Sequence, residues 1–176
     1  MNKLLFFIKR PCVVLVVGKN CSSAAEIISK ILKDKKVLIF ESKLSDFFLK
    51  KSKLPILVIT DSDDRKEISD IKRLAKIIPS HGFLVLNFDR DRIRDIKNIC
   101  IAKCLTYGFY KKADLQVSDL NISPDGTNFK INYQGNIVPF WFKESLEKKH
   151  IYSILSGIAV GVIKGINLVE ISQSLK

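Results

Sequence analysis

Four nearly unbroken apolar runs, separated by segments with helical periodicity, constrain the fold of this chain more than any other feature. The runs cover residues 12–17, 37–40, 55–60 and 82–87. A strand that is apolar at nearly every position must be buried on both faces, which is typical of a parallel strand with helices on either side of its sheet. The pattern therefore predicts an α/β fold with a mostly parallel sheet.

The segments between these runs carry helix signals. We expect helices over about 22–34, 44–51, 65–78 and 91–99, and a fifth strand at 104–108. Residues 61–64 supply side chains of the type that cap a helix N-terminus, just before the third of these helices. Pro79 then ends that helix, because proline cannot continue the helical hydrogen bonds.

The pattern changes to a period of two in the last third of the chain. Residues 113–123 and 128–133 alternate between apolar and polar side chains, and residues 137–142 return as a third segment, with turn residues between the three. This alternation predicts a small antiparallel β-meander. A long helix over 146–164 follows, with small residues on one face that indicate close packing, and a short helix at 168–175 comes last.

We expect one domain over residues 1–176. It comprises an α/β part at 1–110, the meander at 111–143 and C-terminal helices at 144–176.

The formal net charge is +12, which indicates either an anionic partner or a lysine-rich usage imposed by an AT-rich genome. Lysine is scattered through the whole chain rather than clustered, so we favour the second interpretation over nucleic-acid binding. The aromatic residues Phe83, Phe129, Trp141 and Phe142 stand at apolar strand positions. We therefore expect them in the core rather than on a base-stacking platform.

Cysteine usage indicates the redox compartment. Cys12, Cys21, Cys100 and Cys104 have neither zinc-ribbon spacing nor the density of a disulfide scaffold. We expect reduced thiols in a cytoplasmic protein. The apolar segment at 4–8 is too short for a signal sequence or a membrane span, so we expect an edge strand or a lead-in segment that packs on the core.

The turn after the first apolar run carries the first functional signal. Its order is strand, glycine-containing turn and helix N-terminus, which is how a phosphate-binding P-loop is built. A working P-loop ends in Gly-Lys followed by Ser or Thr, but here the turn continues into Cys21-Ser22-Ser23. The framework for weak anion binding at the helix N-terminus is present, and the lysine is missing.

Three further stretches share an order and spacing with one family. Residues 82–89 match "G-x-x-V-L-N-x-D-D" in all but the last position, residues 106–129 are similar to "T-[FY]-G … A-D … N-I … D-G-x-x-F", and residues 154–160 resemble "A-L-A-A-I-A-V". The chain thus resembles the central ATP-binding domain of the Mur ligases, the ATP-dependent amide ligases of peptidoglycan precursor synthesis. The resemblance implies a P-loop-like sheet and, in the family, ATP and Mg²⁺.

The residues that handle ligands depart from the family pattern. Gly18 and Asn20 match positions of the family's "T-G-T-N-G-K-T-T-T", and Ser22 or Ser23 stands near its metal-binding threonine. These four are the candidate nucleotide-binding residues of a degenerate loop, although we expect the serines to cap the helix rather than bind Mg²⁺. Lys72 is the nearest match to the family's carbamylated lysine, and we interpret it as a solvated helix residue.

Other family motifs are also incomplete. Glu41 follows the second apolar run where the family uses a glutamate and a histidine for its metals, but the two histidines, His81 and His150, lie elsewhere, and His81 reads as an exposed turn residue. The stretch 147–153 aligns with "G-x-H-N-V-x-N" and retains neither its glycine nor its asparagines. We assign no metal ligands, and we expect the family's N-terminal UDP-binding and C-terminal ligase domains to be absent.

The sequence therefore predicts a degenerate, catalytically inactive relative of the Mur ligases. We expect it to act as a structural or regulatory partner in cell-envelope synthesis, with a protein partner or as a homo-oligomer, and without a membrane span. One alternative is an ATP-dependent ligase subunit completed by a partner chain. The other is a basic nucleic-acid-binding module.

Overall fold

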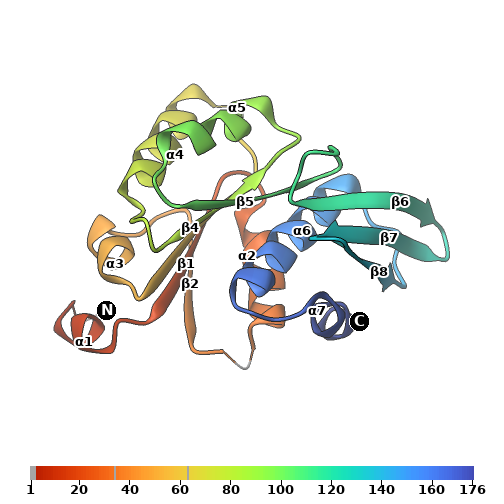
Figure 1. The fold of residues 1–176 in the computed structure, drawn as a ribbon, viewed down its shortest axis with the longest axis horizontal. Helices are drawn as coiled ribbons and strands as arrows, with labels where there is room; N and C mark the ends of the chain where they lie inside the picture. The colour runs from red at the N-terminus through yellow and green to blue at the C-terminus, as the bar shows by residue number, and fades with distance from the viewer. Residues whose placement is uncertain (1–2, 34, 63) are drawn as a thin grey trace.

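The computed structural model describes residues 3–33, 35–62 and 64–176, and its strands form one continuous sheet (Figure 1). The order across the sheet is β2-β1-β3-β4-β5-β6-β7-β8. The strands from β2 to β6 pair in parallel, and β6, β7 and β8 pair antiparallel. The bounds are β1 Cys12–Val17, β2 Val37–Glu41, β3 Leu54–Ile59, β4 Phe83–Asn87, β5 Lys103–Gly108, β6 Leu115–Ser123, β7 Gly126–Tyr133 and β8 Asn136–Phe142. The predicted α/β class and the meander are confirmed.

Helices cover both faces of the parallel part. They are α1 Lys3–Lys9, α2 Cys21–Ile31, α3 Asp46–Lys51, α4 Arg65–Ile77, α5 Asp91–Arg94 with a 3₁₀ turn η1 Asp95–Ile99, α6 Lys148–Ile163 and α7 Leu168–Ser174. Every residue of β1 is buried, and alternate side chains enter two separate cores. Val14 packs in the core with α2, α6 and α7, whereas Leu15 packs in the core with α1, α3 and α4. Burial on both faces is thus the reason for the unbroken apolar runs.

The meander extends the parallel sheet rather than forming a separate layer. Tyr107 of β5 pairs with Leu115 of β6, and Gly108 pairs with Gln116. Helix α6 crosses beneath this junction and packs closely on α2, where a Cβ on Gly157 would stand 2.5 Å from Ile27 Cγ2. The predicted small-residue face of this helix is therefore confirmed.

Two expectations about apolar residues need correction. Residues 4–8 lie in helix α1, so the edge strand is wrong, whereas the alternative of a lead-in segment that packs on the core is confirmed by Phe6, whose ring centroid lies 4.8 Å from that of Phe48. A helix satisfies its own backbone hydrogen bonds, so this segment needs no neighbouring strand. Trp141 is 67 % exposed because Phe140, the preceding residue of β8, takes the buried face and stacks on Phe129.

The cap of α4 lies where the sequence placed it. The Asp64 carboxylate accepts hydrogen bonds from the backbone N–H groups of Lys66 and Glu67. Asp63 of the same capping segment and Asp34, the expected end of the first helix, lie outside the described residues. Within the described ranges, no helix has the length and apolar character needed to cross a membrane.

Candidate functional site

The turn between β1 and α2 is three residues long, at positions 18–20, and it lies against the end of β3. The backbone N–H of Lys19 donates to the carbonyl oxygen of Asp61 at 2.7 Å. The Thr60 hydroxyl donates to the carbonyl oxygen of Lys19 at 2.6 Å. Gly18 has a φ of 100°, and a Cβ there would overlap the Asp61 carbonyl oxygen, so glycine is required at this position. The turn is therefore closed onto the neighbouring strand.

The start of α2 differs from the expected cap. Its N-cap residue is Asn20, in the left-handed region with a φ of 58° and without a side-chain capping bond. Ser22 lies in the first helical turn, where its hydroxyl donates to Glu41 Oε2 at 2.5 Å. The expected serine cap is thus wrong, because the helix begins one residue before Ser22.

The contact between Ser22 and Glu41 brings together a hydroxyl and a carboxylate, two oxygen groups of the kind that can ligate Mg²⁺. Parallel pairing of β1 and β2 sets Val16 opposite Glu41 and so positions the carboxylate beside α2. In the part of the chain that the structure describes, no group of three or more His, Cys, Asp or Glu side chains could hold a metal ion. Mg²⁺ in nucleotide sites takes its remaining ligands from phosphates and water. Two oxygens are therefore an incomplete set without a bound phosphate.

The four predicted nucleotide-binding residues lie on the turn at 18–20 and on the first helical turn of α2, and three of them border different cavities. Asn20 lines a cavity of about 130 Å³, Gly18 one of about 500 Å³, and Ser23 one of about 760 Å³. Ser22 lines none of these three. Sites for ligands of nucleotide or drug size usually measure several hundred Å³, so the smallest cavity suits a single small anion.

Basic side chains surround the smallest cavity, and most of them have partners. Arg90 forms an ion pair with Asp61 at 3.0 Å, and Lys149 forms one with Glu147 at 2.8 Å. The Lys148 ammonium lies 5.0 Å from the centre of the Phe109 ring, a cation–π contact. Because these three side chains already interact with acids or an aromatic ring, less positive charge is available to a bound anion than the number of basic residues around the cavity suggests.

A partly buried carboxylate next to this cavity joins three elements. Asp89, after β4, accepts hydrogen bonds from the backbone N–H groups of Phe109 and Tyr110 at 2.8 and 2.9 Å, and from the Tyr152 hydroxyl at 2.9 Å. Burial, and next this hydrogen bond, raise the pKa of Tyr152. A Cβ on Gly108 would stand 2.6 Å from Asp89 Oδ1, so the carboxylate fills the space of a side chain. Asp89 is thus occupied in holding β4, β5 and α6 together.

Tyr107 has the one buried side-chain oxygen or nitrogen in the described residues that lacks a hydrogen-bond partner. Its ring is fully buried in the core shared with α6. Burial raises the pKa of its hydroxyl, and the negative charges of Asp61 and Asp89 contribute to the increase. Since a buried hydroxyl without a partner costs free energy, this position is a local weakness of the fold.

The remaining candidates lie away from the turn. Lys72 is exposed on α4, which packs on the face of the sheet opposite α2, and it lines none of the three cavities. His81 is an exposed turn residue, as predicted. His150 lines the cavity of about 760 Å³ together with Ser23.

Comparisons with known proteins now complement this geometry. No family model matches the chain. It is 25 % identical over 108 residues to the UDP-N-acetylmuramate–L-alanine ligase of Alkaliphilus metalliredigens, covering 61 % of this chain and 24 % of that protein. It is 32 % identical over 90 residues to the UDP-N-acetylmuramoyl-L-alanyl-D-glutamate–2,6-diaminopimelate ligase of Chlamydia muridarum, covering 51 % and 18 %.

Solved structures agree with these relatives. The MurF of Acinetobacter baumannii superposes with a TM-score of 0.79 at 10 % identity, over 98 % of this chain and 46 % of that one. The MurF of Thermotoga maritima in complex with ADP gives 0.77 at 13 % identity, over 97 % and 50 %. The chain is a relative of the Mur ligases. Its fold is that of their central domain, and it spans about a quarter or less of the length of the two curated relatives.

The similarity to Mur ligases gives a context to two site residues that the motif comparison did not single out. Asp89 is the acidic residue of the family-like motif at 82–89, but the sequence did not reveal that backbone N–H groups from residues 109 and 110 engage it. Lys148 and Tyr152 lie in the stretch 147–153, where the sequence differs from the family motif. That difference was the sequence signal that could have drawn attention to them. Both side chains line the smallest cavity of this Mur ligase relative.

Proposed function

We propose that this Mur ligase relative is a pseudoenzyme that does not carry out ATP-dependent ligation. In this proposal it serves as a structural or regulatory partner in the synthesis of the cell envelope, bound to another protein or to a second copy of itself. A cytoplasmic location fits its four unpaired thiols. The observation that carries the proposal is the closed turn at residues 18–20.

The closed turn argues against a phosphate cradle. In a P-loop, successive backbone N–H groups point at the phosphates, and a lysine reaches the terminal ones. Here the N–H of Lys19 is bonded to Asp61, and no lysine stands at the motif's lysine position. A triphosphate would have to break this bond and find its positive charge among side chains that already have partners.

ATP and Mg²⁺ are implied by the family, and the residues present do not fit them as a set. Ligation through an acyl phosphate develops negative charge that cations and divalent metals must stabilise. The pair formed by Ser22 and Glu41 offers two metal ligands, and the exposed Lys72 lines none of the three cavities around the turn. We therefore derive no catalytic step for this chain alone.

The same pair supports a second candidate, a ligase subunit completed by a partner chain. A partner could add the missing lysine and metal ligands to the hydroxyl and carboxylate of Ser22 and Glu41, which already lie 2.5 Å apart. This candidate predicts binding of Mg-ATP that weakens at least tenfold when Glu41→Gln removes a charged ligand. The pseudoenzyme proposal predicts that Glu41→Gln changes nothing measurable in a nucleotide titration.

The stacked aromatic pair of β7 and β8 gives the nucleic-acid alternative no support, although the neighbouring Trp141 is exposed. Phe129 and Phe140 are buried and stacked on each other rather than displayed on the surface. A base-stacking platform needs exposed rings beside cations.

A ligase assay in two formats tests the proposal. The protein alone, given Mg-ATP, a UDP-N-acetylmuramoyl acceptor and an amino acid, should release no phosphate above background. Added to an active Mur ligase, it should change that enzyme's rate if it acts as a regulatory partner, with Glu41→Gln acting like the unaltered protein. Phosphate release by the protein alone that depends on Glu41 would overturn the proposal.

A further inference from the structure

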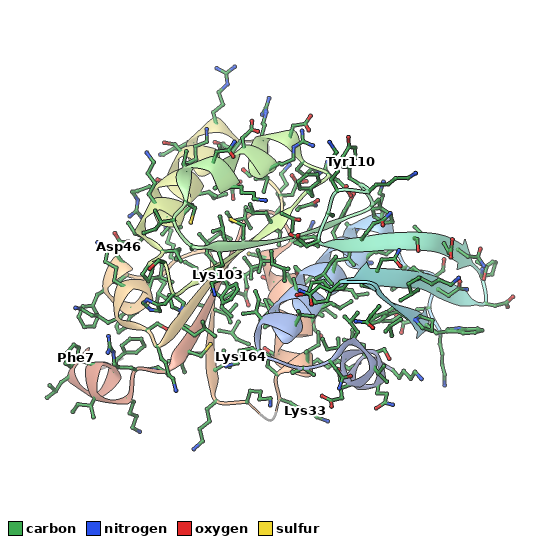
Figure 2. All side chains as sticks on the ribbon, in the orientation of Figure 1. Phe7, Lys33, Asp46, Lys103, Tyr110 and Lys164 are labelled. Carbon is green, nitrogen blue, oxygen red and sulfur yellow. The ribbon has the colours of Figure 1, made fainter. Side chains whose placement is uncertain are left out.

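Helix α1 presents an apolar face to solvent at one end of the molecule (Figure 1). Leu4, Phe7 and Ile8 are 70, 50 and 70 % exposed. Their spacing of three and four residues places them on one side of a helix, so they form a continuous strip. Phe6 points the other way and anchors the helix on Phe48. Figure 2 labels Phe7 beside α1, at the end of the molecule where α3 also lies.

Exposed cations surround this strip. They are Lys9 at the end of α1, Arg10 just after it, Lys50 and Lys51 at the end of α3, and Lys53 two residues further on. The segments 3–11 and 47–54 contain no aspartate or glutamate. The nearest acid along the second segment, Asp46, is paired with Arg73 at 2.9 Å.

Specific contacts hold the strip and the cations together as one surface. Arg10 Nε donates to the carbonyl oxygen of Lys51 at 3.3 Å, and the Lys51 ammonium lies 6.0 Å from the centre of the Phe7 ring. We call the surface formed by α1, Arg10 and residues 50–53 the basic apolar patch.

We propose that the basic apolar patch docks on a lipid bilayer with anionic headgroups. A helix with apolar side chains on one face and lysine or arginine at its borders lies in the bilayer interface with its apolar face inserted. Cations near an anionic leaflet add to that affinity. The helix does not cross the bilayer, which agrees with the lack of a membrane-spanning helix in the described residues.

The chemistry of the patch favours lipid over other anionic partners. The exposed aliphatic side chains of Leu4 and Ile8 can gain free energy by leaving water, and a phosphate backbone offers them no apolar surface. The patch lies before the start of β1, whereas the turn at 18–20 follows its end. Docking through α1 therefore leaves that turn uncovered and is independent of the proposed function.

Vesicle co-sedimentation tests the proposal on the full chain. The protein should bind vesicles of equal parts phosphatidylglycerol and phosphatidylcholine, and bind pure phosphatidylcholine at least tenfold more weakly. Phe7→Ser with Ile8→Ser, and separately Lys50→Gln with Lys51→Gln, should each lower the partition coefficient about tenfold or more. The matched controls, Ile122→Ser with Ile137→Ser and Lys111→Gln with Lys112→Gln, remove exposed side chains elsewhere and should leave binding unchanged.

Tryptophan fluorescence tests the orientation. The only tryptophan, Trp141, lies on β8, six strands from β1 across the sheet and so roughly 30 Å away. Its emission should not change on anionic vesicles, whereas a Phe7→Trp, Trp141→Phe variant should shift to shorter wavelength. Any of three results would overturn the proposal: no binding to the anionic vesicles, equal loss in the control variants, or a shift of Trp141 emission in the unaltered protein.

Discussion

The backbone N–H of Lys19 donates to the carbonyl oxygen of Asp61 at 2.7 Å, and this one bond turns the first loop of the sheet toward its neighbouring strand. In a phosphate-binding loop the corresponding groups face the ligand. Gly18 and Thr60 complete the closure, one by leaving room for the Asp61 carbonyl oxygen and the other by donating to the loop.

Thr60→Val should weaken the attachment of the turn at 18–20 to β3 without creating a cavity in the core. The change keeps the shape of a side chain that is buried but removes its hydroxyl, which leaves the carbonyl oxygen of Lys19 without that donor. We expect the free energy of unfolding to fall by about 1–2 kcal/mol in urea denaturation. Thr60→Ser keeps the hydroxyl and should cost clearly less. Equal losses for the two variants would mean that the hydrogen bond does not hold the loop.

Gly108→Ala should destabilise the fold through the Asp89 carboxylate. The added methyl group would stand 2.6 Å from Asp89 Oδ1, which already accepts the backbone N–H of Tyr110. We expect a loss of about 2–3 kcal/mol in the free energy of unfolding. Gly135→Ala is the control, because it also places alanine at a positive φ but has no atom within 4 Å. A loss no larger than that of the control would contradict the packing described for Asp89.

Tyr107→Phe should raise stability at neutral pH. The change removes the buried hydroxyl that has no hydrogen-bond partner in the described residues, so we expect a gain of about 1 kcal/mol in chemical denaturation. Tyr152→Phe is the matched control, because its hydroxyl donates to Asp89 and its removal should lower stability. If Tyr107→Phe lowers stability as much as Tyr152→Phe, the Tyr107 hydroxyl has a partner in solution.

The same variant should change the pH dependence of stability. Burial raises the pKa of Tyr107 above its ordinary value of 10.0, so above that pH the unfolded chain releases a proton that the folded chain keeps. The ionisation of Tyr107 therefore leaves the free energy of unfolding unchanged below about pH 10. As the pH rises further, it lowers the free energy of unfolding by about 1.4 kcal/mol per pH unit. Tyr107→Phe should flatten the decline by that amount, since all other groups are shared. Parallel curves for the two proteins would contradict the assignment.

The parallel part of the fold could be predicted because burial on both faces leaves a signal in every residue of a strand. All six residues of β1 are buried, and the run at 12–17 marks the strand to the residue. The exposure of Trp141 could not be predicted in the same way, because residues 137–142 are apolar throughout and their pattern does not say which face of an edge strand meets solvent.

The site was less predictable than the fold because its contacts join distant residues. Ser22 meets Glu41 through the pairing of β1 with β2, and Tyr152 meets Asp89 across 63 positions in the sequence. Motif comparison singled out residues 18–23 as a candidate nucleotide-binding loop. It could not show that the turn closes on Asp61, because that bond depends on where the end of β3 lies.

Gly157→Ala should weaken the packing of α6 on α2. A Cβ there would stand 2.5 Å from Ile27 Cγ2, which outweighs the better helix propensity of alanine. We expect a loss of about 1–2 kcal/mol in the free energy of unfolding. The loss should shrink when Ile27→Ala removes the opposing methyl group in a double-mutant cycle. If Gly157→Ala costs as much stability in the Ile27→Ala variant as in the unaltered protein, contact with Ile27 is not the cause of the loss.

Calorimetric titration of the whole chain with Mg-ATP tests the central claim most directly. The MurF of Thermotoga maritima, whose structure is a complex with ADP, is a suitable positive control in the same buffer. With the turn closed by the bond between Lys19 and Asp61, we expect no saturable heat and a Kd weaker than about 1 mM. Saturable binding of one nucleotide per chain with a micromolar Kd would contradict the account.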